Sequence, residues 1–245
     1  MRFTTDALVI RETRIGESDK LVTLLTREYG VIKAFAPGAK SIKSKKAAAT
    51  GLLSYSNFAI TKKNDTYRIN ETSIIRIFFG AGSDVLKLSL AQYFCELALV
   101  LEPDAESSEE FLRIILNSLH FLVEDVKSIE LIKAITEFRI ATISGYMPDL
   151  VACSDCGAFE SDIMNFKIGD GSILCDKCYS EVGAFKIDKT ILSAMRHIVY
   201  SKFSSIYNFE IPENHAKILS DLTGRYIKVQ TDHNFKTLDF YNSIK

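Results

Sequence analysis

The first eighty residues alternate apolar and polar positions in short runs, which is the pattern of half-buried β-strands. Gly16, Gly30, Gly38 and the pair Asn64-Asp65 separate these runs, as turns between neighbouring strands would. The runs are DALVIRE, LVTLLTRE, GVIKAFAPG, SYSNFAITKK and TYRINETSII. Five such strands predict a small closed β-barrel of the OB type, a fold that commonly binds nucleic acids. The pattern alone does not distinguish a closed barrel from an open sheet.

From Asp84 onward the apolar residues recur every three or four positions, which is typical of helices with one buried face. These helices are apolar enough to pack on one another as a bundle. The sequence therefore predicts an α+β protein, with an OB-fold domain at 1–80 and a helical domain at 81–245. The expected helices cover residues 84–103, a segment that begins at a Ser107/Glu110 capping box, residues 128–142, residues 189–203 behind Asp188, and residues 213–229.

Four of the five cysteines form two C-x-x-C pairs, which are Cys153/Cys156 and Cys175/Cys178. Each pair lets two thiolates face one ion from a single tight turn, and two pairs supply the four sulfurs of a tetrahedral zinc site. Gly157 can take the positive φ that such a turn needs. The intervening residues resemble a hairpin that turns at Gly169-Asp170-Gly171. We therefore expect one structural Zn²⁺ in a zinc ribbon, inserted in the helical domain at about 150–180.

Three other interpretations of the cysteines remain open. A redox dithiol needs only one pair and a thioredoxin-like surrounding fold, and an iron–sulfur cluster fits the ligand type better than the spacing. A catalytic zinc is disfavoured because four thiolates close the coordination sphere. The start of the chain has no export signal, so a reducing cytosol favours metal binding over disulfides. Cys95, on the apolar helix expected at 84–103, is interpreted as inert core.

The net charge of −1 conceals an uneven distribution along the chain. Residues 1–80 hold fourteen Lys and Arg against seven Asp and Glu, and residues 81–245 hold sixteen against twenty-four. A basic module joined to an acidic body indicates that the first part contacts a polyanion. Lysines also crowd the segment GAKSIKSKKAAATG at 38–51, which we expect to be an exposed, flexible loop.

Such a loop can follow a phosphate backbone whatever the base sequence, although a solvated loop kept basic for solubility has the same composition. Phe35, Tyr55, Phe58 and Tyr67 are candidates for stacking on bases, or alternatively fill the barrel core. The candidate DNA-binding cations of the loop and the predicted strands are Lys33, Lys40, Lys43, Lys45, Lys46, Lys62, Lys63 and Arg68.

The sequence carries no recognisable catalytic constellation. Its four histidines are scattered without an H-E-x-x-H pair, and GAKSIKSK lacks the frame of a nucleotide-binding P-loop. No apolar stretch is long enough to span a membrane without interruption by charge. We therefore expect a protein that is not an enzyme and binds neither nucleotide nor membrane.

Two stretches resemble the RecO family of recombinational DNA-repair proteins. The first includes G-E-S-D at Gly16–Asp19, L-L-T at Leu24–Thr26, and G-A-K at 38–40 followed by K-S-K at 43–45. The second is GYMPDLVACSDCG, which leads into the first cysteine pair. Family members often carry arginine where this chain has Lys40, an exchange that keeps the charge and loses the planar fork.

The resemblance implies an N-terminal OB-fold, a helical body with an inserted zinc ribbon, and binding of single- and double-stranded DNA. It further implies annealing of complementary strands, and cooperation with RecR and single-stranded-DNA-binding protein in loading RecA onto DNA. The implied location is the bacterial cytoplasm, at the nucleoid. The C-terminal tail of single-stranded-DNA-binding protein is acidic and needs a basic acceptor. The candidates on the late helices are Arg196, Lys202, Arg225 and Lys228.

Two functions of other classes stay open beside this one. The first is a zinc-ribbon protein that acts as an RNA-binding or transcription accessory factor. The second is a protein-bridging scaffold whose basic face contacts an acidic partner. Relative affinity for DNA and RNA distinguishes the first, and DNA binding by residues 1–80 distinguishes the second.

Overall fold

The structure is a computed structural model that describes residues 1–41, 44–80, 83–180 and 183–245. The chain separates into two compact units. The barrel unit comprises Met1–Glu124 and Phe235–Lys245, and the ribbon unit comprises Asp125–Asn234. The separate folding of residues 1–80 as a domain stays a prediction.

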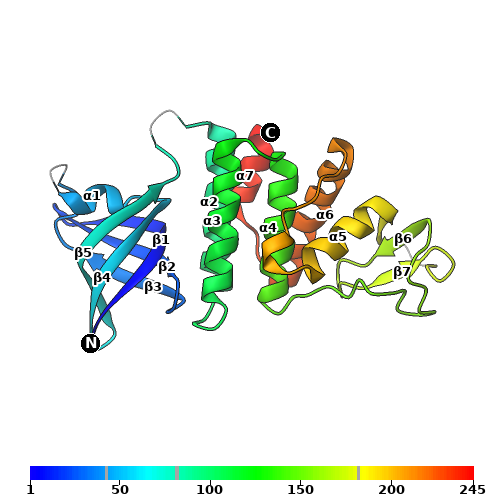
Figure 1. Cartoon of the computed structure of the whole chain (residues 1–245), viewed down its shortest axis with the longest axis horizontal. Coiled ribbons are helices and arrows are strands. Elements are labelled where there is room, and N and C mark those ends of the chain that lie inside the picture. The colour runs from blue at the N-terminus through cyan, green and yellow to red at the C-terminus, as the bar shows by residue number, and fades with distance from the viewer. Residues whose placement is uncertain (42–43, 81–82, 181–182) are drawn as a thin grey trace. The chain divides into compact units, whose positions relative to one another are not determined.

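Five strands of the barrel unit close into a barrel in the order β1-β2-β3-β5-β4, with β4 pairing back onto β1 (Figure 1). This is the predicted OB-type barrel, and it excludes an open sheet. Neighbouring strands are antiparallel except for β3 and β5, which run parallel. The strands are β1 (Arg2–Ile15), β2 (Asp19–Thr26), β3 (Val31–Ala36), β4 (Ser54–Lys63) and β5 (Thr66–Ile77).

Alternate side chains of these strands fill the barrel interior, because successive residues of a strand point to opposite faces of the sheet. Val22, Leu24 and Phe58 are among the residues completely removed from solvent in this core. Tyr55 is buried as well. The core interpretation is therefore correct for Phe58. Tyr55 is buried outside this core cluster and its hydroxyl accepts a hydrogen bond from Arg27, so neither ring is available for stacking on bases.

The described end of the lysine-rich segment is helical, whereas the sequence predicted an exposed, flexible loop. Helix α1 (Lys45–Ala49) occupies part of it, and the Ser44 hydroxyl accepts a hydrogen bond from the Lys46 backbone N–H at 3.2 Å. Ala49 and Thr50 at its end are fully buried. The prediction was wrong here because the alanines both favour a helix and fit against the barrel. In Figure 1, α1 and the N-terminus lie at opposite ends of the barrel.

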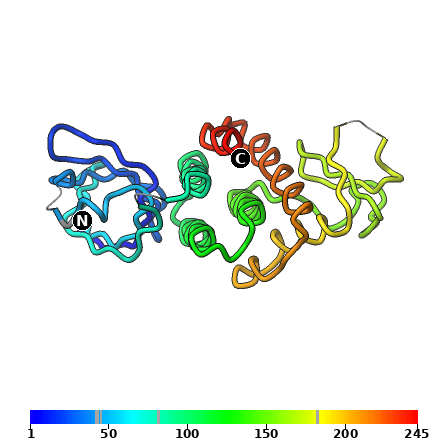
Figure 2. The backbone as a smooth tube through the Cα atoms, turned by 90° about the horizontal axis from the view of Figure 1, so that it is seen from above, coloured from blue at the N-terminus to red at the C-terminus, as the bar shows by residue number. Residues whose placement is uncertain are grey.

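The barrel unit also contains α2 (Val85–Leu101), α3 (Ser108–Glu124) and α7 (Lys236–Ile244). The first two were predicted, whereas α7 was not. Helix α7 packs beside α2 (Figure 2). The rings of Tyr93 and Phe235 meet there edge to face, with their centres 5.5 Å apart. The Glu96 carboxylate accepts hydrogen bonds from the backbone N–H groups of Lys236 and Thr237, which fixes the start of α7.

Helices and a small sheet make up the ribbon unit. Ser128 and Asp188 cap α4 and α5 through their side chains, as typical N-cap residues do. The sheet has the order β7-β6-β8, so β8 adds a third strand to the predicted hairpin. The elements are α4 (Ile129–Ile143), β6 (Ile163–Phe166), β7 (Ile173–Cys175), β8 (Phe185–Asp188), α5 (Lys189–Tyr200), the 3-10 helix η1 (Phe203–Ser205) and α6 (Glu213–Thr231).

Three aromatic rings, from Phe138 on α4, Phe166 on β6 and Tyr226 on α6, pack against one another and join the sheet to the helices. Gly171 in the hairpin turn has a φ of +71°, and a side chain there would meet the Tyr226 hydroxyl at 2.7 Å. The predicted turn therefore needs glycine at this position. None of the helices described reaches the length and apolar character that crossing a membrane requires.

Candidate metal centre and nucleic-acid interface

The structure brings the four predicted cysteine ligands together. The Sγ atoms of Cys153, Cys156, Cys175 and Cys178 all lie within 4.8 Å of one another. Those of Cys156 and Cys175 are 3.7 Å apart. Four sulfurs at about 2.3 Å from one tetrahedral ion are separated by about 3.8 Å, so the donor set fits a single metal ion.

Tight turns aim the thiols of each pair toward the cluster. Gly157 has a φ of +72° and donates a hydrogen bond from its N–H to the Cys153 carbonyl oxygen. In the second pair, the backbone N–H groups of Cys178 and Tyr179 donate to the Cys175 carbonyl oxygen. The predicted role of Gly157 is confirmed, because its left-handed conformation favours glycine.

The protonation of the cluster also points to a cation. Burial raises the pKa of the Cys153 thiol, but backbone N–H groups of Cys156, Cys175 and Asp155 hydrogen-bond to its sulfur and bring the pKa to about 6. Hydrogen bonds with Cys156 and Cys175 raise the pKa of Cys178. Four thiols this close cannot all ionise without a cation to neutralise them, and a bound metal ion would supply that charge.

Four sulfurs complete a tetrahedral coordination sphere and leave no position for substrate or water. The centre is therefore suited to a structural role. Cys95 does not belong to this cluster and is buried on α2, where burial raises the pKa of its thiol to about 12. The interpretation of Cys95 as a core residue is confirmed.

On the outer face of the barrel, strands β2, β3 and β5 bring several predicted cations and one aromatic ring together. Phe35 and Arg68 are partners across the parallel β3–β5 pair, and both side chains point outward because Ala34 and Ile69 point into the core. Lys33 is exposed one pleat away, opposite Thr23 of β2. Phe35 is half-buried, so part of its ring is open to solvent.

Arg11 joins this face although the sequence did not identify it. Thr23 on the middle strand β2 pairs with Arg11 of β1 on one side and with Lys33 of β3 on the other. The Arg11 side chain is exposed. Residues directly opposite one another share one face of a sheet. We call Arg11, Lys33, Phe35 and Arg68 the outer basic face. Only the strand register reveals the membership of Arg11.

Lys40 and Asp19 connect this face to the turn between β1 and β2. The Lys40 Nζ donates a hydrogen bond to the Gly16 carbonyl oxygen. The Gly38 N–H donates to the Asp19 carboxylate, and this bond, helped by Ser18 and by the positive charges of Arg68 and Lys40, lowers the pKa of Asp19. Lys40 and Arg68 therefore both act electrostatically on the Asp19 carboxylate.

The remaining loop lysines have different surroundings. Lys46 is half-buried and donates to the Ile69 carbonyl oxygen at 3.2 Å, so part of its role is to hold α1 on β5. Lys45 begins α1. Lys43 lies outside the residues that the structure describes.

Lys62 and Lys63 stand at the turn between β4 and β5. The Lys62 Nζ lies 5.2 Å from the centre of the Tyr67 ring, a cation–π arrangement. Lys63 is exposed opposite Thr66. Asn64 has a φ of +53°, which confirms the predicted tight turn.

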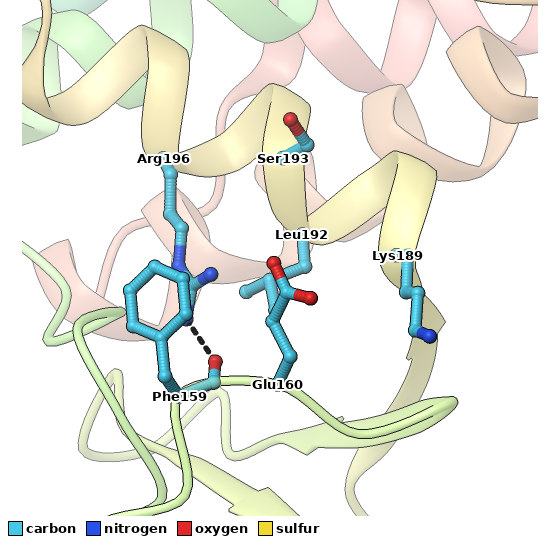
Figure 3. A pocket seen from close by; sticks show the side chains of 6 residues that line it. All are labelled: Phe159, Glu160, Lys189, Leu192, Ser193 and Arg196. Atoms are coloured by element: carbon cyan, nitrogen blue, oxygen red, sulfur yellow. Dashed lines mark hydrogen bonds between the residues drawn. The ribbon is translucent and has the colours of Figure 1, made fainter.

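The four partner-binding candidates of the late helices are not equivalent. The Arg196 guanidinium donates to the carbonyl oxygens of Leu150, Val151 and Phe159 and lies 3.9 Å from the Phe159 ring. In Figure 3 the Arg196 side chain points toward Phe159. Both residues line a hollow of about 180 Å³. Arg196 therefore ties the ribbon to α5.

The other three candidates differ in their freedom to bind a partner. Arg225 forms an ion pair with Asp221 and lies over the Phe185 ring. Lys202 and Lys228 are exposed. These two lysines are the candidates whose charge is most accessible to an acidic partner.

Two family models together match most of the chain. The model described as Recombination protein O N terminal matches residues 1–78, and Recombination protein O C terminal matches residues 82–239. The DNA repair protein RecO of Acetivibrio thermocellus is 32% identical, over 98% of this chain and 96% of its own length. Those of Alkaliphilus metalliredigens and Caldicellulosiruptor bescii are 26% and 27% identical, over 100% and 98% of both chains.

Proposed function

The chain belongs to the RecO family of DNA repair proteins, and we propose that it is a non-enzymatic recombination mediator. In this role it binds single- and double-stranded DNA on its barrel and promotes annealing of complementary strands. Base pairing supplies the free energy of annealing, so the reaction needs no nucleotide hydrolysis.

The observation that carries this proposal is the outer basic face. Lys33, Phe35 and Arg68 share one surface of β3 and β5, and OB-folds use the strand 2–3 face for oligonucleotides. Cations hold the phosphates without reading sequence, and a half-exposed ring can stack on a base. The candidate cations Lys40, Lys46, Lys62 and Lys63 would extend the phosphate path along the barrel, and Lys43 and Lys45 stay candidates from the sequence.

We propose zinc as the metal of the four-cysteine centre. The paired C-x-x-C spacing and the all-thiolate donor set favour Zn²⁺, which prefers a closed tetrahedron in structural sites. When bound, the ion would supply stability to the ribbon and no chemistry. Cys153, Cys156, Cys175 and Cys178 would hold it.

The family supports two protein partners as further proposals, which are RecR and the C-terminal tail of single-stranded-DNA-binding protein. We place the tail near Lys202 and Lys228, whose charges are the most accessible of the four candidates. The proposed location is the bacterial cytoplasm, at the nucleoid where these partners and the DNA are found.

Strand annealing by the purified protein tests the proposal. Two complementary fluorescent strands should pair faster with the protein than without it. Coating the strands with single-stranded-DNA-binding protein should slow spontaneous pairing much more than pairing in the presence of this protein. A parallel reaction with RNA strands separates DNA repair from an RNA-binding role. Annealing no faster than the spontaneous rate would contradict the proposal.

A further inference from the structure

Three aromatic rings from distant segments of the chain meet on the barrel. They belong to Phe3 on β1, Tyr29 in the turn between β2 and β3, and Tyr67 on β5. The Phe3 ring lies 4.3 Å from the Tyr29 ring and 6.2 Å, edge to face, from the Tyr67 ring. We call these three residues the aromatic cluster. Phe3 and Tyr67 pack against the barrel core, so the cluster stands on a rigid base.

Tyr29 is the most open member of the cluster. It is 39% exposed, and its hydroxyl has no hydrogen-bond partner among the residues described. Its turn is nevertheless firmly held. The Thr26 hydroxyl accepts from the Tyr29 N–H and donates to the Gly30 carbonyl oxygen. An exposed ring on a rigid turn loses little conformational freedom when a flat ligand stacks on it.

The side of the aromatic cluster that faces the β4–β5 turn carries positive charge, which favours binding of a polyanion there. Lys62 lies over the Tyr67 ring, and Lys63 is exposed next to it at the same turn. Two carboxylates lie on the Tyr29 side, and both accept hydrogen bonds. Glu28 precedes Tyr29 and accepts from the Thr5 hydroxyl, and Asp104, whose backbone lies beside Gly30, accepts from the Ser107 N–H. The β4–β5 turn carries two lysines against one exposed carboxylate, that of Asp65, so a strand that enters there would meet a net positive charge before the Tyr29 ring.

We propose that the aromatic cluster is a stacking site for an unpaired base of single-stranded DNA. The base lies on the open face of Tyr29, while Lys62 and Lys63 hold the neighbouring phosphates. This inference rests on the proposed DNA binding and goes beyond it, because it gives the barrel a preference for unpaired bases. Bases within a duplex are covered on both faces by their neighbours and cannot stack on the ring.

A single-tryptophan variant tests the contact directly. The chain contains no tryptophan, so in Tyr29→Trp all indole emission comes from this site. Adding a single-stranded oligonucleotide should quench that emission with the same midpoint as binding measured by anisotropy of a labelled strand. A blunt duplex of the same sequence should bind and leave the emission nearly unchanged. Binding of the single strand without quenching, or equal quenching by the duplex, would overturn the proposal.

Removing the ring tests its contribution to affinity. Tyr29→Leu should weaken binding of the single strand by roughly 5- to 150-fold, the range of one stacked base, and binding of the duplex by much less. Tyr29→Phe should bind like the wild type. Phe240→Leu, which removes a ring that is 51% exposed on α7, is the matched control and should have no effect.

The outcomes separate this site from the proposed function. Unchanged affinity of Tyr29→Leu for the single strand overturns the stacking site and leaves binding by the outer basic face intact. An equal loss for single strand and duplex also overturns it. Wild-type protein that binds neither form overturns both proposals. If Tyr29→Leu melts at a lower temperature than the wild type, the tryptophan readout decides.

Discussion

The Asp19 carboxylate accepts a hydrogen bond from the Gly38 backbone N–H at 2.8 Å, across nineteen positions of sequence. A second bond runs in parallel, from the Lys40 backbone N–H to the Ser18 carbonyl oxygen at 2.9 Å. Together they join the turn between β1 and β2 to the segment after β3. The G-E-S-D and G-A-K stretches that carry the family resemblance are therefore two sides of one local structure.

The joint between Asp19 and Gly38 should weaken in acid. The pKa of Asp19 is lowered from 3.8, chiefly by the Gly38 N–H. A carboxylate with a lowered folded pKa stabilises the fold above its ordinary pKa, and that contribution is lost as pH falls through the lowered value. In an NMR titration, the Gly38 amide shift should move with a midpoint below 3.8. Asp19→Asn keeps an acceptor oxygen and should abolish the titration; a midpoint at or above 3.8 would contradict the assignment.

Replacing Lys33 and Arg68 together with alanine should reduce the salt dependence of DNA binding. Each phosphate contact on a single strand contributes about −0.7 to the slope of log affinity against log salt, so the slope should become less negative by about 1.4. The loss should be the same for all sequences, because phosphate contacts carry no base information. Lys202→Ala with Lys228→Ala is the matched control of equal charge. An equal change in that control would show that net charge, and not the outer basic face, is responsible.

Purified protein should contain close to one zinc per chain by elemental analysis, and Cys175→Ser should lose it. Structural zinc contributes about 10–16 kcal/mol of apparent binding free energy in small zinc modules, so its loss should unfold the ribbon. DNA binding should fall less than stability, because the outer basic face belongs to the barrel unit. Cys95→Ala, which removes a thiol outside the cluster, should keep the metal. Iron instead of zinc in the wild-type protein would contradict this prediction and favour the iron–sulfur cluster that the sequence left open.

Breaking the buried ion pair between Lys133 and Glu137 should strongly destabilise the ribbon unit. The Lys133 Nζ donates to Glu137 at 2.8 Å and to the Ser220 carbonyl oxygen at 2.8 Å, and both charged side chains are nearly or fully buried. Glu137→Leu leaves the ammonium without its counter-ion and should cost about 3–5 kcal/mol in urea unfolding. The double variant with Lys133→Met should recover much of that loss. Equal stability of the single and double variants would contradict this explanation.

Reversing the charges of Lys202 and Lys228 should weaken binding of an acidic peptide tail with an apolar tip. Exposed ion pairs are each worth about 0.2–1 kcal/mol, so the double variant should lose roughly 2- to 30-fold in affinity. Arg196 is left unchanged because its guanidinium holds the ribbon. Lys33→Glu on the barrel is the control. Unchanged calorimetric affinity in the double variant would remove this placement of the tail.

Local patterns were enough to predict the barrel strands, most helices and the metal ligands. The alternation around Phe58 and the side-chain cap at Asp188 are properties of a few neighbouring residues, and the structure confirms both. The cysteine centre was predictable for the same reason, because each C-x-x-C turn is built within four residues. Strand β8 and helix α7 were missed because partners far along the chain stabilise them.

The nucleic-acid face was only partly predictable. Lys33 and Arg68 were identified by charge, but their closeness depends on the parallel β3–β5 register, which no local pattern contains. The sequence did not identify Arg11 for the same reason. Arg11 and Lys33 become neighbours only because both strands pair with Thr23 of β2. Arg196 has a structural role that its charge alone did not indicate. The carbonyl oxygens that occupy its guanidinium leave no trace in the sequence.

Residues 235–245 belong to the barrel unit, so this unit is completed only after the ribbon unit has been synthesised. Helix α2 leaves the ribosome long before α7, so the surface around Tyr93 and Glu96 stays uncovered while the ribbon unit is being made. A premature stop codon just before Phe235 would spare every residue of the ribbon and still damage the unit that begins the chain. For the same reason, a tag joined after Lys245 would be attached to the barrel unit and not to the ribbon unit that precedes it in the sequence.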